Sequence, residues 1–342
     1  MPSREGSAAH DPSHARWDER IARARHLAAE YSTAADVLTF YTGLAEYQKS
    51  LLGKHNRVRS PEPAAGPLVP FLEALDLDAV LAAIPDFLSW LPRVAPAPLV
   101  EAAAKMRRLD RAQWRHLAHS YLSCDGRAVP DADQTLVFVL EALLQPFAEQ
   151  VAMRIATSSI SARGAPPPFG HPNAHEPRAG DPAAAAPLSG LGAPPPSSGR
   201  GRRLEDSLVA AAAGADPNFE PRGPTRCPIC SALPVVGVLR EVGQGAKRTL
   251  VCALCLTERE YLRVVCPACG EQQFDALPVY TADQFAHVRI EACESCSHYL
   301  KTIDLTKDGL AVPLVDYMAS VSLDVWARDR GYVRLRPNLL RM

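Results

Sequence analysis

The chain has 342 residues, 47% of them hydrophobic and 22% charged, which leaves room for two domains and at least one buried core. Its formal net charge of −1 provides no bulk attraction to nucleic acid or to an anionic membrane. The polar segment at residues 1–6 lacks the apolar region of a secretory signal, and no uninterrupted apolar stretch approaches the ~18 residues of a membrane span. We therefore expect a cytoplasmic protein with no membrane span.

The first half of the chain has helical periodicity. Apolar residues recur at intervals of three and four over 16–31 and again over 37–51. A further helix is predicted to begin at 110–113, and another is predicted over about 133–155. Nothing in this half alternates as a strand does. We predict that residues 1–157 form an all-helical domain.

The composition then changes. Between Arg163 and Arg203 there are ten prolines and seven glycines, with few aliphatic residues. Such a segment cannot bury enough apolar area to offset the conformational entropy lost on ordering. We predict a flexible linker over residues 158–225.

Eight of the nine cysteines fall into four Cys-x-x-Cys pairs after this linker. This spacing lets two sulfur atoms in one tight turn bind the same ion, and two pairs complete a tetrahedral shell of four thiolates. Disulfides are the weaker reading, since the chain shows no export signal. The pairs therefore predict two metal ions, each held by four cysteines, and zinc and iron both suit such a shell. The predicted ligands are Cys227, Cys230, Cys252, Cys255, Cys266, Cys269, Cys293 and Cys296.

Strand-like segments lie between the cysteine pairs and repeat in two units. Residues 226–264 read as one ribbon of Cys-x-x-Cys, strand, turn, strand and Cys-x-x-Cys, and residues 265–306 read as a second. Residues 307–342 predict a helix beginning at Pro313, followed by a tail. The expected fold class is α+β: an all-helical domain, two tandem rubredoxin-like or zinc-ribbon-like subdomains and a C-terminal helix.

Spacing alone does not fix how the pairs combine, because four pairs can form two sites in three ways. Joining neighbouring pairs closes the shortest loops and so costs the least loop entropy. We therefore favour one site at 227–255 and a second at 266–296.

Other candidate residues carry less weight. Cys124 lies in an expected turn and reads as a small hydrophobic residue. His116 and His119 share a helix face but have no third ligand at helical spacing beside them. We found no phosphate-binding loop, zinc-protease motif or nucleophile elbow, so we predict no catalytic residues and no enzymatic activity. Eight basic residues against nine acidic ones over 226–306 argue against a nucleic-acid face.

Seven segments around the cysteines and near the C-terminus carry a resemblance to a known family: Cys227–Val235, Leu250–Glu258, Leu262–Cys266, Glu291–Cys296, Tyr299–Lys301, Met318–Asp324 and Gly331–Tyr332. They resemble the family of the formate dehydrogenase accessory protein FdhE. The similarity covers most of the chain except the Pro/Gly-rich segment. It is most specific over the last third.

This resemblance implies a cytoplasmic maturation factor that binds the molybdenum- or tungsten-containing catalytic subunit of a respiratory formate dehydrogenase before export. It also implies that the eight cysteines bind iron in a rubredoxin-like way, and it leaves a homo-oligomer open. The sequence departs from the family at Arg259, at His298 and in the long linker. Two alternatives remain: a rubredoxin-like iron protein that carries electrons, and a zinc-ribbon protein that binds nucleic acid.

Overall fold

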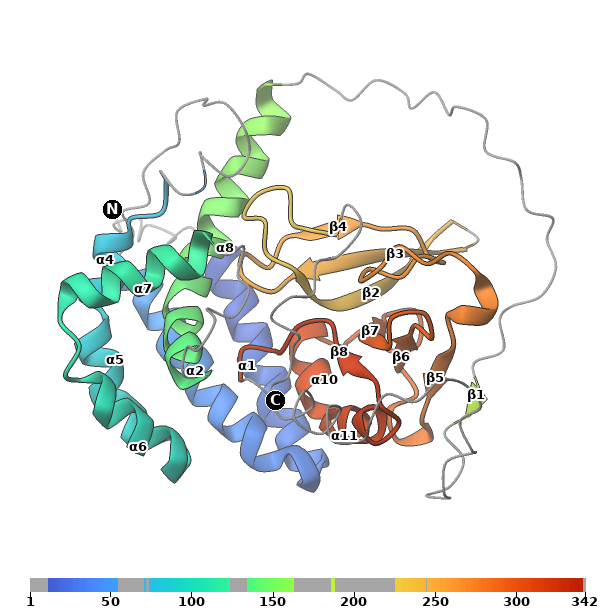
Figure 1. Cartoon of the computed structure of the whole chain (residues 1–342), viewed down its shortest axis with the longest axis horizontal. Helices are drawn as coiled ribbons and strands as arrows, with labels where there is room; N and C mark the ends of the chain where they lie inside the picture. Colours follow the sequence, from blue (N-terminus) through green and yellow to red (C-terminus); the bar gives the residue numbers. More distant parts are fainter. Residues whose placement is uncertain are drawn as a thin grey trace, which may run out of the picture.

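The computed structural model describes residues 12–54, 71, 74–123, 134–162, 186–187, 225–243 and 245–340. Helices from the first half of the chain form one side of the molecule, and a twisted sheet with the C-terminal helices forms the other (Figure 1). This confirms the predicted α+β class with the helices first. The predicted linker and Cys124 lie almost wholly outside the described residues, and the division of the chain into separate domains stays a prediction.

The described part of 1–162 is helical throughout, as the periodicity predicted. The helix start predicted at 110–113 is present and has a reciprocal cap: Gln113 N–H donates to Asp110 Oδ1 (2.8 Å) and Asp110 N–H donates to Gln113 Oε1 (2.9 Å). The helices are α1 (Pro12–Glu30), η1 (Ser32–Ala34), α2 (Ala35–Lys54), α4 (Leu77–Ala82), α5 (Ile84–Trp90), η2 (Leu91–Arg93), α6 (Ala97–Met106), α7 (Arg111–Ser123) and α8 (Gln134–Ala162).

Helix α8 is the central helix of this half. Its Gln134–Ala156 stretch is long and apolar enough to cross a membrane by composition alone, but 94% of the apolar window is buried inside the structure, as in the core helix of a soluble protein. Three buried polar residues, Glu141, Gln145 and Glu149, recur every four residues and therefore share one face. This polar face contacts the rest of the chain: Glu149 accepts two hydrogen bonds from Arg20 of α1 (2.9 and 2.6 Å), and Gln145 and Glu141 contact the C-terminal half.

One mixed sheet holds the strands of both predicted ribbons, in the order β1-β5-β6-β7-β2-β3-β4, with β8 paired to β7. Neighbours within each ribbon are antiparallel, whereas β2 and β7 join the two ribbons in parallel, with Gly237 opposite Thr302. The strands are β1 (Ala186–Pro187), β2 (Pro234–Val242), β3 (Gly245–Cys252), β4 (Glu258–Glu260), β5 (Val279–Thr281), β6 (Val288–Ala292), β7 (His298–Asp304) and β8 (Val333–Arg334).

A glycine permits the close pairing of the two ribbons. A Cβ atom at Gly237 would lie 2.3 Å from Thr302 Oγ1, so any larger residue would force β2 and β7 apart. The tandem ribbons are therefore joined edge to edge, which the strand pattern alone did not predict.

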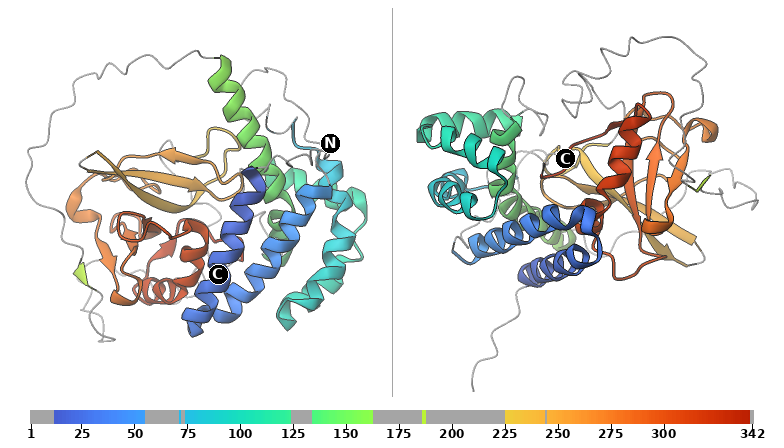
Figure 2. Two further views of the ribbon diagram at one scale, coloured as in Figure 1. Left: turned by 180° about the vertical axis from the view of Figure 1, so that it is seen from behind. Right: turned by 90° about the horizontal axis from the view of Figure 1, so that it is seen from below.

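The two faces of the sheet have different surroundings. One face packs its aliphatic residues, Val236, Val238 and Ile290 among them, against α1, α2 and the C-terminal helices (Figure 2). The other face carries Leu250 and Leu300 in a much smaller apolar cluster, together with the second group of cysteines. The large core therefore lies between helices and sheet, and the second group lies away from it.

The C-terminal helix predicted as one continuous element is two helices, α10 (Pro313–Ala319) and α11 (Val321–Asp329). The break falls at Ser320, whose backbone leaves the helical region (φ −88°, ψ 36°). The buried Lys301 ammonium donates to the carbonyls of Tyr317 (2.5 Å) and Ser320 (3.1 Å). A buried cation thus provides hydrogen bonds to the carbonyl groups at the break. The helix was predicted from the spacing of apolar residues, and that spacing does not indicate where the break lies.

Candidate metal centres

Each of the four cysteine pairs forms the same backbone turn. The N–H of the first cysteine donates to the carbonyl five residues later, at 2.9 Å for Cys227, 3.0 Å for Cys252, 2.8 Å for Cys266 and 3.0 Å for Cys293. This repetition shows that the local fold, and not only the spacing, is common to all four pairs. It points both sulfur atoms of a pair to the same side.

The residue after the second cysteine has a left-handed backbone in every pair: Ser231 (φ 60°), Leu256 (φ 54°), Gly270 (φ 81°) and Ser297 (φ 58°). Glycine adopts this conformation freely, whereas a residue with a Cβ pays about 1 kcal/mol. Leu256 is the one bulky residue among the four, and it adopts the turn nonetheless. Its partly buried side chain packs against the large core.

The first cluster brings together Cys227, Cys230, Cys252 and Cys255. The Sγ atoms of Cys227 and Cys255 are 3.5 Å apart, and those of Cys230 and Cys252 are 3.4 Å apart. A regular tetrahedron with metal–sulfur bonds of about 2.3 Å has sulfur–sulfur edges of about 3.8 Å, whereas a disulfide bond is about 2.0 Å long. The four thiols are therefore unbonded and spaced to hold one ion.

The second cluster brings together Cys266, Cys269, Cys293 and Cys296. Its Sγ atoms lie 3.8 Å apart between Cys266 and Cys296, and 3.6 Å apart between Cys269 and Cys293. Within each cluster all four sulfur atoms lie within 4.8 Å of one another. The structure thus groups the cysteines by neighbouring pairs, as the loop-entropy argument favoured. That they ligate metal remains a prediction, and the donor set does not choose between zinc and iron.

Hydrogen bonds between the thiols shift the pKa values of the cysteines within each cluster. Hydrogen bonds from Cys230, Cys252 and Cys255 hold the pKa of Cys227 far below its usual range, while the pKa values of Cys230 and Cys255 are raised. In the second cluster a hydrogen bond from Cys296 lowers the pKa of Cys266 to about 5. A bound cation would favour the thiolate form of all four cysteines in each cluster.

The surroundings of the first cluster belong to the helical core. All four of its cysteines are buried and share one apolar cluster with α8 residues such as Leu144 and Phe147. Gln145 on the polar face of α8 donates from Nε2 to the carbonyl of Ala253, inside the second pair (3.0 Å). A metal here would connect the ribbon to the helices.

A buried ion pair adds a further connection at the first cluster. Arg336, in the C-terminal tail, bonds to Glu141 on α8 and to the hydroxyl of Tyr121 on α7 (2.9 Å). Tyr121 itself donates to Glu141 (2.6 Å). Burial opposes the charge of Arg336, but the field of Tyr121, Glu141 and Cys252 raises its pKa. The positive charge of Arg336 therefore lies close to this cluster. The sequence did not predict the ion pair of Arg336 with Glu141, because the two residues lie about 200 positions apart in the chain.

The second cluster has a thinner cover. It shares an apolar cluster of only six buried residues, and Cys269 and Cys296 are partly exposed. Arg248, itself buried, supports it by donating to the carbonyls of Leu262 (3.0 Å) and Val265 (3.1 Å) just before Cys266. The solvent therefore reaches the second cluster more easily than the first.

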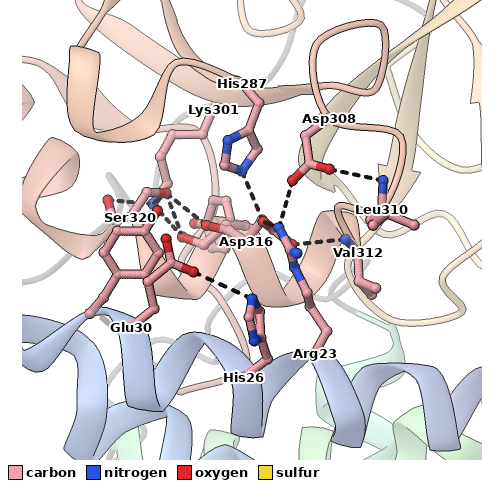
Figure 3. Close-up of polar contacts among 12 residues, drawn as sticks. Arg23, His26, Glu30, His287, Lys301, Asp308, Leu310, Val312, Asp316 and Ser320 are labelled. Atoms are coloured by element: carbon pink, nitrogen blue, oxygen red, sulfur yellow. Dashed lines mark hydrogen bonds and ion pairs between the residues drawn. The ribbon is translucent and has the colours of Figure 1, made fainter.

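A third group of possible ligands serves a different purpose. His287, Asp308 and Asp316 come together, but the Arg23 guanidinium of α1 lies between the carboxylates (Figure 3). Arg23 donates to Asp316 (2.5 and 3.0 Å) and Asp308 (2.8 Å), and His287 Nε2 bonds Asp316 (2.8 Å). Burial tends to raise the pKa of Asp316, but hydrogen bonds from His287 and Arg23 outweigh it and lower that pKa. These residues form a network of ion pairs that links α1 to the C-terminal half.

The remaining candidates are placed as follows. His116 and His119 are both exposed on α7, and neither belongs to a group of potential ligands among the described residues. The departures from the family pattern lie near the clusters: the Arg259 guanidinium lies over the ring of Tyr261 (5.6 Å), and His298 is buried with Nδ1 against the carbonyl of Cys296 (2.9 Å).

The segment that holds both cysteine clusters is similar in sequence to known proteins. Residues 226–263 match the central domain of FdhE, and residues 264–341 match its C-terminal domain. An FdhE homologue of Aquifex aeolicus is 39% identical over 116 residues, which cover 33% of this chain and 41% of the relative. One of Pseudomonas aeruginosa is 38% identical over 121 residues, 34% of this chain and 39% of the relative. The matched segment thus spans about two fifths of these relatives.

The fold extends further than the sequence similarity. The crystal structure of the FdhE protein from Pseudomonas aeruginosa superposes with a TM-score of 0.63 over 97% of this chain and 98% of that one, at 24% identity. At this identity the likeness concerns the fold alone, and it includes the helical half.

Proposed function

We propose that the chain, whose residues 226–341 match the central and C-terminal domains of FdhE, is an accessory factor for respiratory formate dehydrogenase. In this proposal it binds the molybdenum- or tungsten-containing catalytic subunit in the cytoplasm before export. The observation that carries the proposal is the pair of four-cysteine clusters within the matched segment. The chain acts by binding, without catalysing a reaction of its own.

The chemistry of the clusters supports a binding role. Four protein thiolates fill a tetrahedral shell, so a zinc ion there has no open position for water or substrate. Each ion would instead hold two turns together, and its binding energy would stabilise the fold. We propose Cys227, Cys230, Cys252 and Cys255 as ligands of the first ion, and Cys266, Cys269, Cys293 and Cys296 as ligands of the second.

The test is capture of the catalytic subunit. We expect the purified chain, loaded with metal, to retain the catalytic subunit of a formate dehydrogenase from the same cell, and a strain that lacks the chain to lose formate oxidation. A matched control is the electron-transfer subunit of the same enzyme, which should not be retained. Normal formate oxidation in the deletion strain together with no capture would contradict the proposal.

A second candidate function follows from the exposure of the second cluster. If iron occupies it, the partly exposed Cys269 and Cys296 bring a one-electron centre close to the surface, as an electron carrier requires. Anaerobic purification followed by metal analysis and visible spectroscopy separates the cases. Two zinc ions per chain and no sulfur-to-iron charge-transfer absorption would exclude the electron carrier.

A further inference from the structure

The second cluster has a surface groove beside it. The groove has a volume of about 460 Å³ and runs from the loop before Cys266 to the sheet face behind it. Val264, Phe274 and Arg263 are among the residues that line it, together with Cys266 of the second cluster. The groove therefore has a mostly apolar lining with several charged residues, and it adjoins the cluster directly.

Large apolar side chains around this groove are unusually exposed. Leu262 is 70% exposed, Phe274 is 61% exposed and Val264 is 46% exposed. They make up three of the seven large hydrophobic residues that are exposed in the described part of the chain. Single exposed apolar residues are ordinary, but a group beside a groove marks an interaction surface.

Two polar anchors hold these side chains in place. The buried Arg248 binds the carbonyls at both ends of the 262–265 turn and pairs with Glu291, so Leu262 and Val264 project from a fixed turn. Glu271 accepts the backbone N–H groups of Gln272 and Gln273 (2.9 Å each), which fixes the loop just before Phe274. A surface ordered in advance loses less conformational entropy on binding.

The charges around the groove favour a cationic occupant. Arg248 and Arg289 are neutralised by Glu291 and Asp304, which leaves Arg263 as the remaining arginine of the groove. Three further carboxylates, called here the rim carboxylates, neighbour groove or cluster residues in the chain: Asp275 follows the lining residue Phe274, and Glu271 and Glu294 lie on the two cysteine turns of the second cluster. They lie close together, because Ser295 Oγ donates to Glu271 (2.6 Å) and Glu294 N–H donates to the carbonyl of Ala276 (2.9 Å). Four thiolates around a divalent or trivalent ion would add further negative charge.

We propose that this groove docks a segment of the partner in which apolar side chains stand next to arginine or lysine. The apolar residues would cover Leu262, Val264 and Phe274, and the cation would face the rim carboxylates and the second cluster. This inference rests on the proposed function and names the surface that performs it. The helical half and the first cluster then support that surface.

The test uses the full chain loaded with metal and two probes: the catalytic subunit, and overlapping synthetic peptides that cover it. We expect the bound peptides to be those that combine apolar residues with arginine or lysine. Leu262→Ser combined with Phe274→Ser should weaken binding of both probes by about tenfold or more, because each lost contact removes buried apolar area. Leu310→Ser, at an 82% exposed leucine on another loop, should leave binding unchanged.

The charge is tested separately. Asp275→Lys should weaken binding by a few fold and flatten its dependence on salt, because it removes an attraction at the rim. Asp329→Lys, at the end of α11, makes the same change of charge elsewhere and should have no effect. Thermal melts and two bound metals per chain show that each variant is folded.

The remaining outcomes are distinguishable. Equal binding of the subunit by the wild-type chain and the Leu262/Phe274 variant would overturn this surface and leave the proposed function standing. A change of oligomeric state in that variant, with subunit binding intact, would assign the groove to a second copy of this chain and overturn the proposal. No binding of the subunit by the wild-type chain would overturn both.

Discussion

The two cysteine clusters share one backbone turn, used four times, but differ in what surrounds them. The first lies within the core of the helical half, where Gln145 and the Glu141–Arg336 pair connect it to α7, α8 and the C-terminal tail. The second has four buried apolar residues around its own cysteines, two of those cysteines are partly exposed, and a groove adjoins it. The same metal-binding unit can therefore serve stability at one position and recognition at another, because burial and neighbours decide its role.

The largest expected effect comes from removing ligands. Cys227→Ser with Cys230→Ser should destabilise the whole chain, because the ~10 kcal/mol or more that a structural ion contributes supports the helix–sheet core as well. Cys266→Ser with Cys269→Ser should destabilise the chain less, because the second cluster lies in a small apolar cluster away from the large core. Thermal melts followed by circular dichroism, with metal analysis, compare the two. Equal melts and unchanged metal content in both variants would contradict the assignment of the ligands.

Sequence reasoning reached the clusters because their signal is local. The Cys-x-x-Cys spacing predicts the ligands, and the short loops predict which pairs combine. The residues that make the clusters different are set by distant contacts: Arg336 meets Glu141 across 195 residues, and Arg23 meets Asp316 across 293. No periodicity encodes such contacts. The parallel pairing of β2 with β7 and the break at Ser320 escaped prediction for the same reason.

The next largest expected effect on the free energy of unfolding comes from Arg336, beside the first cluster, and Arg248, beside the second. Arg336→Met should lower the free energy of unfolding by about 3 kcal/mol, because it leaves Glu141 buried without its cation. Arg248→Met should cost about 2 kcal/mol, chiefly by releasing the 262–265 turn at the second cluster. Urea unfolding followed by tryptophan fluorescence measures both. In the double variant Arg336→Met, Glu141→Gln much of the stability should return, and no recovery would show that packing and not charge dominates.

A pH dependence should arise on the opposite face of the sheet from the second cluster. Burial lowers the pKa of Lys301 to about 8, against the partial opposition of Asp324. The unfolded lysine, with a pKa near 10.5, keeps its proton between about pH 8 and pH 10.5 while the folded one loses it. The contribution of this residue to stability should therefore rise with pH across that window, by about 3 kcal/mol.

Lys301→Met provides the control for this window. Its unfolding free energy should not show the rise that the wild-type chain gains from Lys301 between about pH 8 and about pH 10.5. The rate of metal loss from the second cluster, measured in the same samples, should be the same in both proteins. An identical pH profile for the two chains would show that Lys301 keeps its charge in the folded protein.

Metal removal should be sequential. A chelator in excess should take the ion of the second cluster about tenfold or more faster than that of the first, because Cys269 and Cys296 are accessible while the first four cysteines open only with the helical core. A colorimetric chelator assay gives the two phases, and loss of the fast phase in Cys266→Ser with Cys269→Ser assigns it. A single phase with equal rates would show that the two surroundings do not differ in dynamics.

The smallest effect isolates the turn that the clusters share. Ser297 has a left-handed backbone (φ 58°) and an exposed side chain, so Ser297→Gly relieves backbone strain with little loss of packing. The gain should be at most about 1 kcal/mol, offset in part by the greater freedom of glycine in the unfolded chain. Gly270→Ala, at φ 81° in the same cluster, should cost a similar amount. Both changes should appear in the fast chelation phase and not in the slow one. An effect on the slow phase would mean that the parallel β2–β7 pairing transmits strain between the clusters, and that the two sites respond as one unit.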